Sequence, residues 1–241
     1  MPLDAMLRRH ATYYPDKTAV VVGDRRLTQA EFNLRVNRLA NALQSVGVGK
    51  GDKLAIALDN SLEVLEIYQA AAKTGIVVVP LSPLLRGDGL VNLINDADSV
   101  AVITMGRLLA EFDRVRERLD VADDRFFAVG GAGDGWTVYN DLVEGAEDAE
   151  PPPALLRGDD VYNIIYSSGT TGAPKGIVHT HDIREAYCTG FAASYRIKPE
   201  SVILHAGSLV FNGAFLTLMP AFYLGCKYVL MESFDAKEMV R

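Results

Sequence analysis

The residues from Ser167 to Lys175 combine small side chains, hydroxyl groups and one cation, a composition suited to binding phosphate. Gly169 and Gly172 let the backbone adopt positive φ and approach a ligand closely, and successive N–H groups in such a turn can form an anion-binding nest. Lys175 adds a mobile cation with three N–H donors. The hydroxyl donors of this loop are Ser167, Ser168, Thr170 and Thr171. The loop is therefore predicted to hold phosphate groups.

The spacing in this loop excludes a Walker A motif, which has Gly, four residues and then Gly-Lys-Ser/Thr. Pro174 stands where the second glycine would be, and Gly176 stands where the metal-binding hydroxyl would be. The alternative to a phosphate site is a solvated turn between two strands. The apolar run Val161–Tyr166 comes directly before the loop and is typical of a buried strand, which favours the phosphate-binding interpretation.

Residues 166–176, Tyr-Ser-Ser-Gly-Thr-Thr-Gly-Ala-Pro-Lys-Gly, resemble the signature loop of the adenylate-forming superfamily. That superfamily contains acyl-CoA synthetases, firefly luciferases and the adenylation domains of nonribosomal peptide synthetases. The sequence Val178-His179-Thr180-His181 that follows is similar to the acyl-CoA synthetase branch. Segments 48–52, 60–61, 73–81 and 224–235 are similar to the family in order and spacing, so the resemblance covers essentially the whole chain.

The resemblance implies an AMP-forming acid–thiol ligase. A carboxylic acid would react with MgATP to give an acyl-adenylate and pyrophosphate, and a thiol, usually that of coenzyme A, would then displace AMP. Lys175 would be catalytic, offsetting charge on the departing pyrophosphate. The nucleotide phosphates would be held by Ser167, Ser168, Gly169, Thr170, Thr171 and Gly172 together with Lys175.

The acid pocket is predicted to involve Phe211, or Val210 under a shifted alignment, and His205. An apolar wall at Phe211 suits a fatty or aromatic acid, although core packing is the alternative for both Phe211 and His205. Two other functions stay open: an adenylation domain of a peptide synthetase and a non-enzymatic nucleotide-binding module. An α-amino acid substrate would need an acidic residue in the pocket, and residues 201–231 contain none.

The family's enzymes are considerably longer than this chain of 241 residues. Their Mg²⁺-binding glutamate, their ribose-binding aspartate and their C-terminal domain with its catalytic lysine have no counterpart before Arg241. We therefore expect the N-terminal part of an acyl-CoA synthetase, inactive by itself; a naturally short protein is the alternative. An incomplete sheet would expose apolar surface and favour dimers or domain swapping.

Strands and helices alternate along the chain, which predicts an α/β fold with largely parallel β-sheets flanked by helices. This matches the αβαβα-type N-terminal region of adenylate-forming enzymes, left incomplete. The acidic stretch 144–153, which ends in three prolines, predicts a linker. It divides the chain into a first α/β subdomain, 1–150, and a truncated phosphate-loop subdomain, 151–241. The expected helices are 3–14, 28–47, 61–75, 90–95, 108–119, 182–195 and 214–223, with a further one starting at Asp235; the expected strands are 19–22, 25–27, 53–58, 76–79, 99–104, 125–129, 161–166, 201–205 and 226–231.

Composition limits the partners of the protein. With 49% hydrophobic residues and a net charge of −7, the chain has an acidic surface that argues against nucleic acid and anionic membranes as main partners. Two cysteines, Cys188 and Cys226, make neither a disulfide framework nor a metal site, and His179 with His181 supplies too few ligands, so no metal site is expected from these residues. No secretory signal or transmembrane run is visible, which predicts a cytoplasmic protein.

Overall fold

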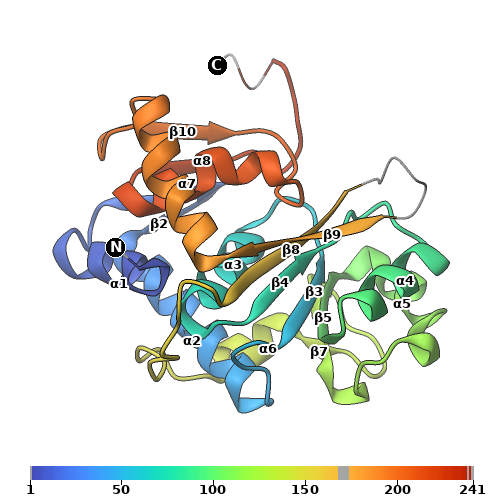
Figure 1. Ribbon diagram of the computed structural model, residues 1–241. Coiled ribbons are helices and arrows are strands. Elements are labelled where there is room, and N and C mark those ends of the chain that lie inside the picture. The colour runs from blue at the N-terminus through green and yellow to red at the C-terminus, as the bar shows by residue number, and fades with distance from the viewer. Residues whose placement is uncertain (1, 168–173, 238, 240–241) are drawn as a thin grey trace.

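The computed structural model describes residues 2–167, 174–237 and 239, and two β-sheets organise them (Figure 1). The larger sheet has seven strands in the order β7-β6-β5-β3-β4-β8-β9. All neighbours in it run parallel except β8 and β9, which form an antiparallel hairpin. Its strands are β3 (Lys53–Ala57), β4 (Val77–Pro80), β5 (Ser99–Met105), β6 (Phe126–Val129), β7 (Thr137–Val138), β8 (Val161–Ser167) and β9 (Lys175–Thr180).

The smaller sheet has four strands in the order β10-β11-β1-β2. Its strands are β1 (Thr18–Val22), β2 (Arg25–Thr28), β10 (Val202–His205) and β11 (Lys227–Leu230). Within it the β1–β2 hairpin, which turns at Gly23 and Asp24, is antiparallel, and the other neighbours are parallel. The prediction of largely parallel sheets is therefore confirmed. Each sheet draws strands from both sides of residue 150, and the division into 1–150 and 151–241 stays a prediction.

Helices pack between and around the two sheets. They are α1 (Leu3–Tyr13), α2 (Gln29–Ser45), α3 (Leu62–Thr74), α4 (Asp88–Asp96), α5 (Leu109–Asp113), α6 (Tyr139–Glu144), α7 (His181–Ser194) and α8 (Phe215–Leu224). Helix α3 is buried along its whole length, because it lies in the core shared by the two sheets. A second core lies on the other face of the larger sheet, under α4 and α5. Adjacent residues of β3 point into different cores: Leu54 into the first and Ala55 into the second.

Local signals in the sequence fix several helix ends. A capping box begins α2: Glu31 N donates to Thr28 Oγ1 at 3.2 Å, and Thr28 N donates to Glu31 Oε2 at 2.8 Å. Ser61 occupies the N-cap position of α3, but its side chain makes no capping hydrogen bond. Gly75 ends α3 in the left-handed region, with φ of 77°, where a side chain would be strained.

Three local predictions need correction. The helix expected over 108–119 is broken: α5 ends at Asp113, and Arg116–Arg118 forms a 3₁₀ turn. The Arg116 guanidinium lies 3.8 Å from the Phe126 ring centroid and donates to the carbonyls of Asp123 and Gly135, contacts that draw the chain out of the helix. Strands β7 and β9 were not predicted. Residues 236, 237 and 239 after Asp235 form turns, and the rest of the helix expected there lies outside the described residues.

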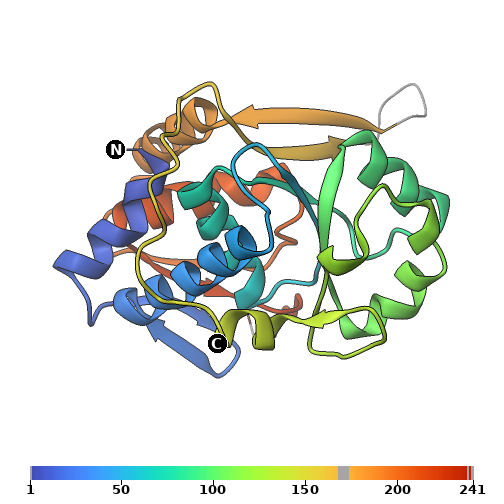
Figure 2. The ribbon, with the colours of Figure 1, turned by 90° about the horizontal axis from the view of Figure 1, so that it is seen from below.

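The acidic segment before β8 is clamped against α2 rather than free (Figure 2). Asn37 and Asn41 of α2 donate to the carbonyls of Asp148, Glu147 and Ala149. Beneath them the Lys73 ammonium, with a side chain only 3% exposed, donates to Glu150 Oε2 at 2.8 Å. The predicted linker is therefore held in place by backbone and charge contacts.

Two further properties follow from the described residues. Cys188 and Cys226 are free and buried. No helix in the ranges 2–167 and 174–237 has the length and apolar character needed to cross a membrane.

Candidate nucleotide and acid site

The hairpin of β8 and β9 places the two described ends of the predicted phosphate loop opposite each other. Ser167 pairs with Lys175 at the open end of the ladder, and both side chains are exposed. The loop between them carries the other predicted phosphate ligands, which lie outside the described residues: Ser168, Gly169, Thr170, Thr171 and Gly172. Figure 1 shows the hairpin extending away from α7, so its open end lies far from that helix.

Alternation along the hairpin puts three cross-strand pairs on one face. Ser167 faces Lys175, and towards the base of the hairpin Asn163 faces His179, with the pair Ile165–Ile177 between them. A strand rises about 3.3 Å per residue, so the Asn163 pair lies roughly 13 Å from the Ser167 pair. One face of the hairpin therefore carries polar groups at both ends and apolar ones in the middle.

An apolar cavity of about 260 Å³ lies beside the open end of the hairpin. It brings Phe211 and Val210 next to Ser167, at the carboxyl ends of β4 and β8. Ligands of open α/β sheets commonly bind at the carboxyl ends of the parallel strands. The residues that line this cavity are Pro80, Leu81, Ser82, Leu85, Leu93, Tyr166, Ser167, Pro174, Val210 and Phe211.

A second cavity of about 360 Å³ shares Phe211 and Ser82 with the first. Asn60 shapes its wall, since its Nδ2 donates to the carbonyls of Gly207 and Met231, and its Oδ1 accepts from Leu209 N at 2.9 Å. No role for Asn60 was predicted from the sequence. The available signal for such a role was an amide side chain shortly after the end of the buried strand β3.

His205 lies at the end of β10, where its ring stacks on Tyr228 with centroids 6.0 Å apart. It lines neither of these two cavities. A role for His205 in the acid pocket therefore stays a prediction without support from its position.

His179 and His181 do not share a face, because the chain leaves β9 at Thr180 and His181 begins α7. His181 packs edge-on against Tyr162, with ring centroids 5.5 Å apart. Among the described residues, no group of three or more His, Cys, Asp or Glu side chains is arranged to hold a metal ion.

Burial lowers the pKa of all four histidines. The pKa of His179 falls from 6.5 to about 4, because the ring is desolvated and the Arg184 cation lies nearby. At a pH between about 4 and 6.5, the His179 imidazole is protonated in the unfolded chain but not in the folded one. The free energy of unfolding should therefore fall as the pH is lowered from about 6.5 towards 4.

Urea unfolding at pH 7 and pH 5 measures this dependence. In a His179→Gln variant the loss of stability between these two pH values should be smaller, because one group that protonates only on unfolding has been removed. If the variant loses as much stability between pH 7 and pH 5 as the unaltered protein, the lowered pKa of His179 is contradicted. The comparison between variants cancels the contributions of the carboxylates, which titrate at lower pH in both proteins.

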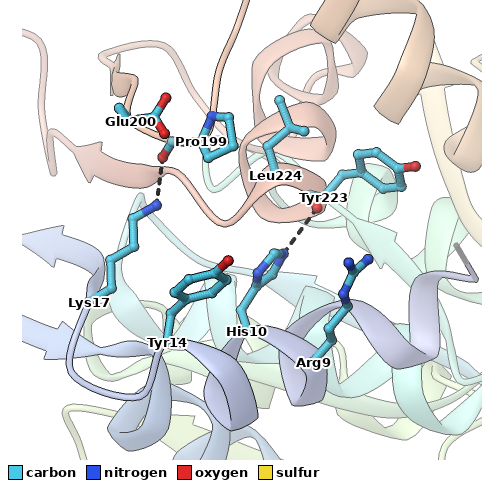
Figure 3. A pocket seen from close by; sticks show the side chains of 8 residues that line it. All are labelled: Arg9, His10, Tyr14, Lys17, Pro199, Glu200, Tyr223 and Leu224. Carbon is cyan, nitrogen blue, oxygen red and sulfur yellow. Dashed lines mark hydrogen bonds between the residues drawn. The ribbon is translucent and has the colours of Figure 1, made fainter.

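A larger cavity, of about 460 Å³, lies away from the hairpin, between α1 and the end of α8 (Figure 3). Two hydrogen bonds join its sides: His10 Nε2 donates to Tyr223 O at 3.0 Å, and Lys17 Nζ donates to Pro199 O at 2.6 Å. None of the described residues that the sequence assigned to the site lines it. Size alone does not identify the functional site in this protein.

The fold and the hairpin define an α/β protein in which Ser167 and Lys175 lie at the open end of the β8–β9 hairpin, beside an apolar cavity. The profile of the family described as "AMP-binding enzyme" matches residues 7–241, and the chain belongs to this family. The resemblance found in the sequence is thereby confirmed.

Known proteins similar to the chain include CoA ligases and a peptide synthase. Long-chain-fatty-acid–CoA ligase FadD13 of Mycobacterium tuberculosis (strain ATCC 25618 / H37Rv) is 30% identical over 238 residues, which are 97% of this chain and 46% of that protein. A linear gramicidin synthase of Brevibacillus parabrevis is 32% identical over 223 residues, which are 92% of this chain and 3% of the synthase polypeptide. The chain spans about half the length of the curated CoA ligases it matches.

Among solved structures, the inhibitor-bound N-terminal domain of FACL13 from Mycobacterium tuberculosis superposes with a TM-score of 0.87 at 28% identity. The match covers 99% of this chain and 59% of that one. The α/β fold class predicted from the sequence is thus the fold of N-terminal domains of acyl-CoA synthetases.

Proposed function

We propose that the full-length protein is an AMP-forming acyl-CoA synthetase. The observation that carries this proposal is the apolar cavity beside Ser167, at the open end of a hairpin that also presents Lys175. A carboxylic acid bound in that cavity would have its carboxylate next to a loop suited to nucleotide phosphates. Family membership and the CoA ligases among the relatives support the same reaction class.

The reaction has two balanced steps. A carboxylate oxygen of the acid attacks the α-phosphorus of ATP, and the bond to the bridging oxygen breaks, so that pyrophosphate leaves. The sulfur of coenzyme A then attacks the acyl carbon, the bond to AMP breaks, and the thiol proton is lost to solvent. Such chemistry depends mainly on positioning and on stabilising charge.

The chain's own residues would act on the first step. Lys175 would offset the negative charge that builds on pyrophosphate, and Ser167 would donate to a phosphate oxygen, together with Ser168, Thr170, Thr171 and the amides near Gly169 and Gly172. Phe211 would form an apolar wall for a fatty or aromatic acid. Mg²⁺ would accompany the ATP phosphates, and no step is assigned to that ion.

Incubating the full-length protein with ATP, coenzyme A and a panel of carboxylic acids tests the proposal. Mass spectrometry should detect an acyl-CoA with a fatty or aromatic acid. Formation of an aminoacyl-adenylate alone would support the peptide-synthetase alternative instead. ATP binding without any acyl product would overturn the proposal in favour of a nucleotide-binding module.

We also propose that exposed apolar side chains let two copies of the chain associate. Val202 and Leu204 on the edge strand β10 are 57% and 42% exposed, and Ile177 and Val178 on the edge strand β9 are 48% and 49% exposed. Exposed edge strands and apolar patches favour pairing between chains. Light scattering that finds only monomers at high concentration would contradict this proposal.

A further inference from the structure

Arg184 is a fully buried cation without an acidic partner among the described residues. The side chain projects from α7 and is 0% exposed. Its Nε and Nη2 donate to Asn163 Oδ1 at 3.1 and 3.0 Å, and its Nη1 donates to Asn212 Oδ1 at 2.9 Å. Both of these hydrogen-bond partners are neutral amides. In the described part of the chain Arg184 forms no ion pair with a carboxylate.

The surroundings of Arg184 stabilise the cation but do not neutralise it. The guanidinium carbon lies 3.9 Å from the Phe215 ring centroid and 5.0 Å from that of Tyr187. Burial lowers the pKa of Arg184 to about 10, so the side chain stays charged at neutral pH. A buried charge without a counter-charge is costly for a fold, and an apolar side chain of similar volume often packs there more favourably. The position therefore calls for an explanation beyond stability.

Polar groups with unused hydrogen-bonding capacity surround this cation. Asn163 Nδ2 and His179 Nδ1, on directly opposite residues of the hairpin, are buried without a hydrogen-bond partner among the described residues. Buried polar atoms are nearly always satisfied, by protein, water or ligand. Asn163 Nδ2 and His179 Nδ1, next to Arg184, could therefore each form one more hydrogen bond.

Asn212, which accepts a hydrogen bond from Arg184, is next in the chain to a residue of the proposed acid pocket. It follows Phe211, the residue that lines both cavities beside the hairpin. Arg184 Nη1 donates to Asn212 Oδ1, and the amide Nδ2 of the same side chain donates to Tyr187 Oη at 3.4 Å, so that the Tyr187 O–H can donate to a further acceptor. A donor backed by a buried cation is polarised and binds an acceptor more strongly.

An aromatic stripe on α7 leads from Arg184 to the surface. Tyr187, Phe191 and Tyr195 follow at helical spacing, with ring centroids 5.0 and 5.7 Å apart, and Tyr195 is 51% exposed. At the buried end of this aromatic stripe, Tyr187 is hydrogen-bonded to Asn212. This arrangement suits a ligand with an apolar or aromatic body and an oxygen at one end.

We infer that Arg184 is a positioning residue, acting through Asn212 and Tyr187, that selects acids with an oxygen on the end remote from the reacting carboxylate. A hydroxyl, carbonyl or second carboxylate would serve as that acceptor. This inference rests on the proposed acyl-CoA synthetase activity and narrows its substrate class from fatty or aromatic acids to oxygen-substituted ones.

The test compares pairs of acids that differ by one oxygen, such as benzoate with 4-hydroxybenzoate and octanoate with 8-hydroxyoctanoate, in the full-length protein. In at least one pair kcat/KM should favour the oxygenated acid about tenfold or more, the scale of a charge-assisted hydrogen bond. Tyr187→Phe keeps the ring and removes only the hydroxyl. This variant and Arg184→Met should reduce the preference to about twofold, chiefly by raising KM for the oxygenated acid, and Arg184→Lys should restore part of it.

Phe191→Leu on the same helix is the matched control, because it alters the stripe without touching a polar group and should change both acids alike. If Arg184→Met fails to fold, Tyr187→Phe carries the test. Equal use of both acids by the unaltered protein, or equal losses for both acids in Tyr187→Phe, would overturn this inference and leave the synthetase activity standing. A protein that activates no acid would overturn both.

Discussion

Replacing Lys175 by alanine in the full-length protein is expected to lower the rate of acid-dependent adenylation by about a hundredfold or more. That is the usual scale for removing one group that stabilises transition-state charge. Lys175 is exposed at the open end of the hairpin, opposite Ser167, so its removal leaves no buried cavity and no broken core contact. The loss should therefore appear in the rate, with the affinity for the acid changed much less.

Single-turnover formation of the acyl-adenylate, together with equilibrium binding of the acid, separates these two quantities. Lys198→Ala is the matched control, because Lys198 is a lysine that lines neither of the cavities beside the hairpin. It should leave both quantities unchanged. A Lys175→Ala protein that loses rate and affinity equally would contradict the role assigned to this lysine.

Replacing Lys73 by methionine is expected to lower the free energy of unfolding by about 3 kcal/mol, at the lower end of the range for breaking a buried charge pair. The Lys73 ammonium donates to Asn33 Oδ1 at 2.7 Å, to Asn37 Oδ1 at 2.6 Å and to Glu150 Oε2 at 2.8 Å. Methionine fills the space but leaves these acceptors unpaired. The Glu150 carboxylate is one-third exposed, so water compensates part of the loss.

Urea unfolding of the two proteins gives this difference. The ion pair of Arg114 and Glu111 supplies the control, because the Arg114 side chain is 75% exposed, and Arg114→Ala should change stability by less than about 0.5 kcal/mol. A second variant, Glu150→Gln added to Lys73→Met, should recover part of the loss by removing the unpaired charge. A Lys73→Met protein as stable as the Arg114→Ala control would show that the clamp on the acidic segment does not contribute.

The features that the sequence predicted correctly are those that depend only on residues close together in the chain. The start of α2 after Thr28, the end of α3 at Gly75 and the strand that begins at Val161 need only local chemistry, and the structure confirms all three. Strand β9 was missed because Lys175–Val178 are exposed at the edge of the sheet and carry no buried apolar pattern. The pairing of β1 with β11 joins segments far apart in the chain, such as Val20 with Tyr228, which no local signal announces.

The candidate site also contains residues that local sequence predicts and residues that only the folded structure brings together. The composition of the loop alone predicts roles for Ser167 and Lys175, and these roles stay predictions. Arg184 was missed because one arginine in a helix with exposed neighbours resembles a solvated charge, and only the packing of α7 against β8 and α8 buries it. The one available signal was Asn163, a polar residue inside the otherwise apolar run of β8.

Acid-dependent exchange of labelled pyrophosphate into ATP by the full-length protein tests the central claim most directly, because it reports the first reaction step without requiring coenzyme A. We expect exchange that depends on a fatty or aromatic acid, is faster for oxygen-substituted members of the panel, and is nearly abolished in Lys175→Ala. The absence of exchange with every carboxylic acid, from a folded protein that binds ATP, would contradict the assignment of this chain to an acid-activating enzyme.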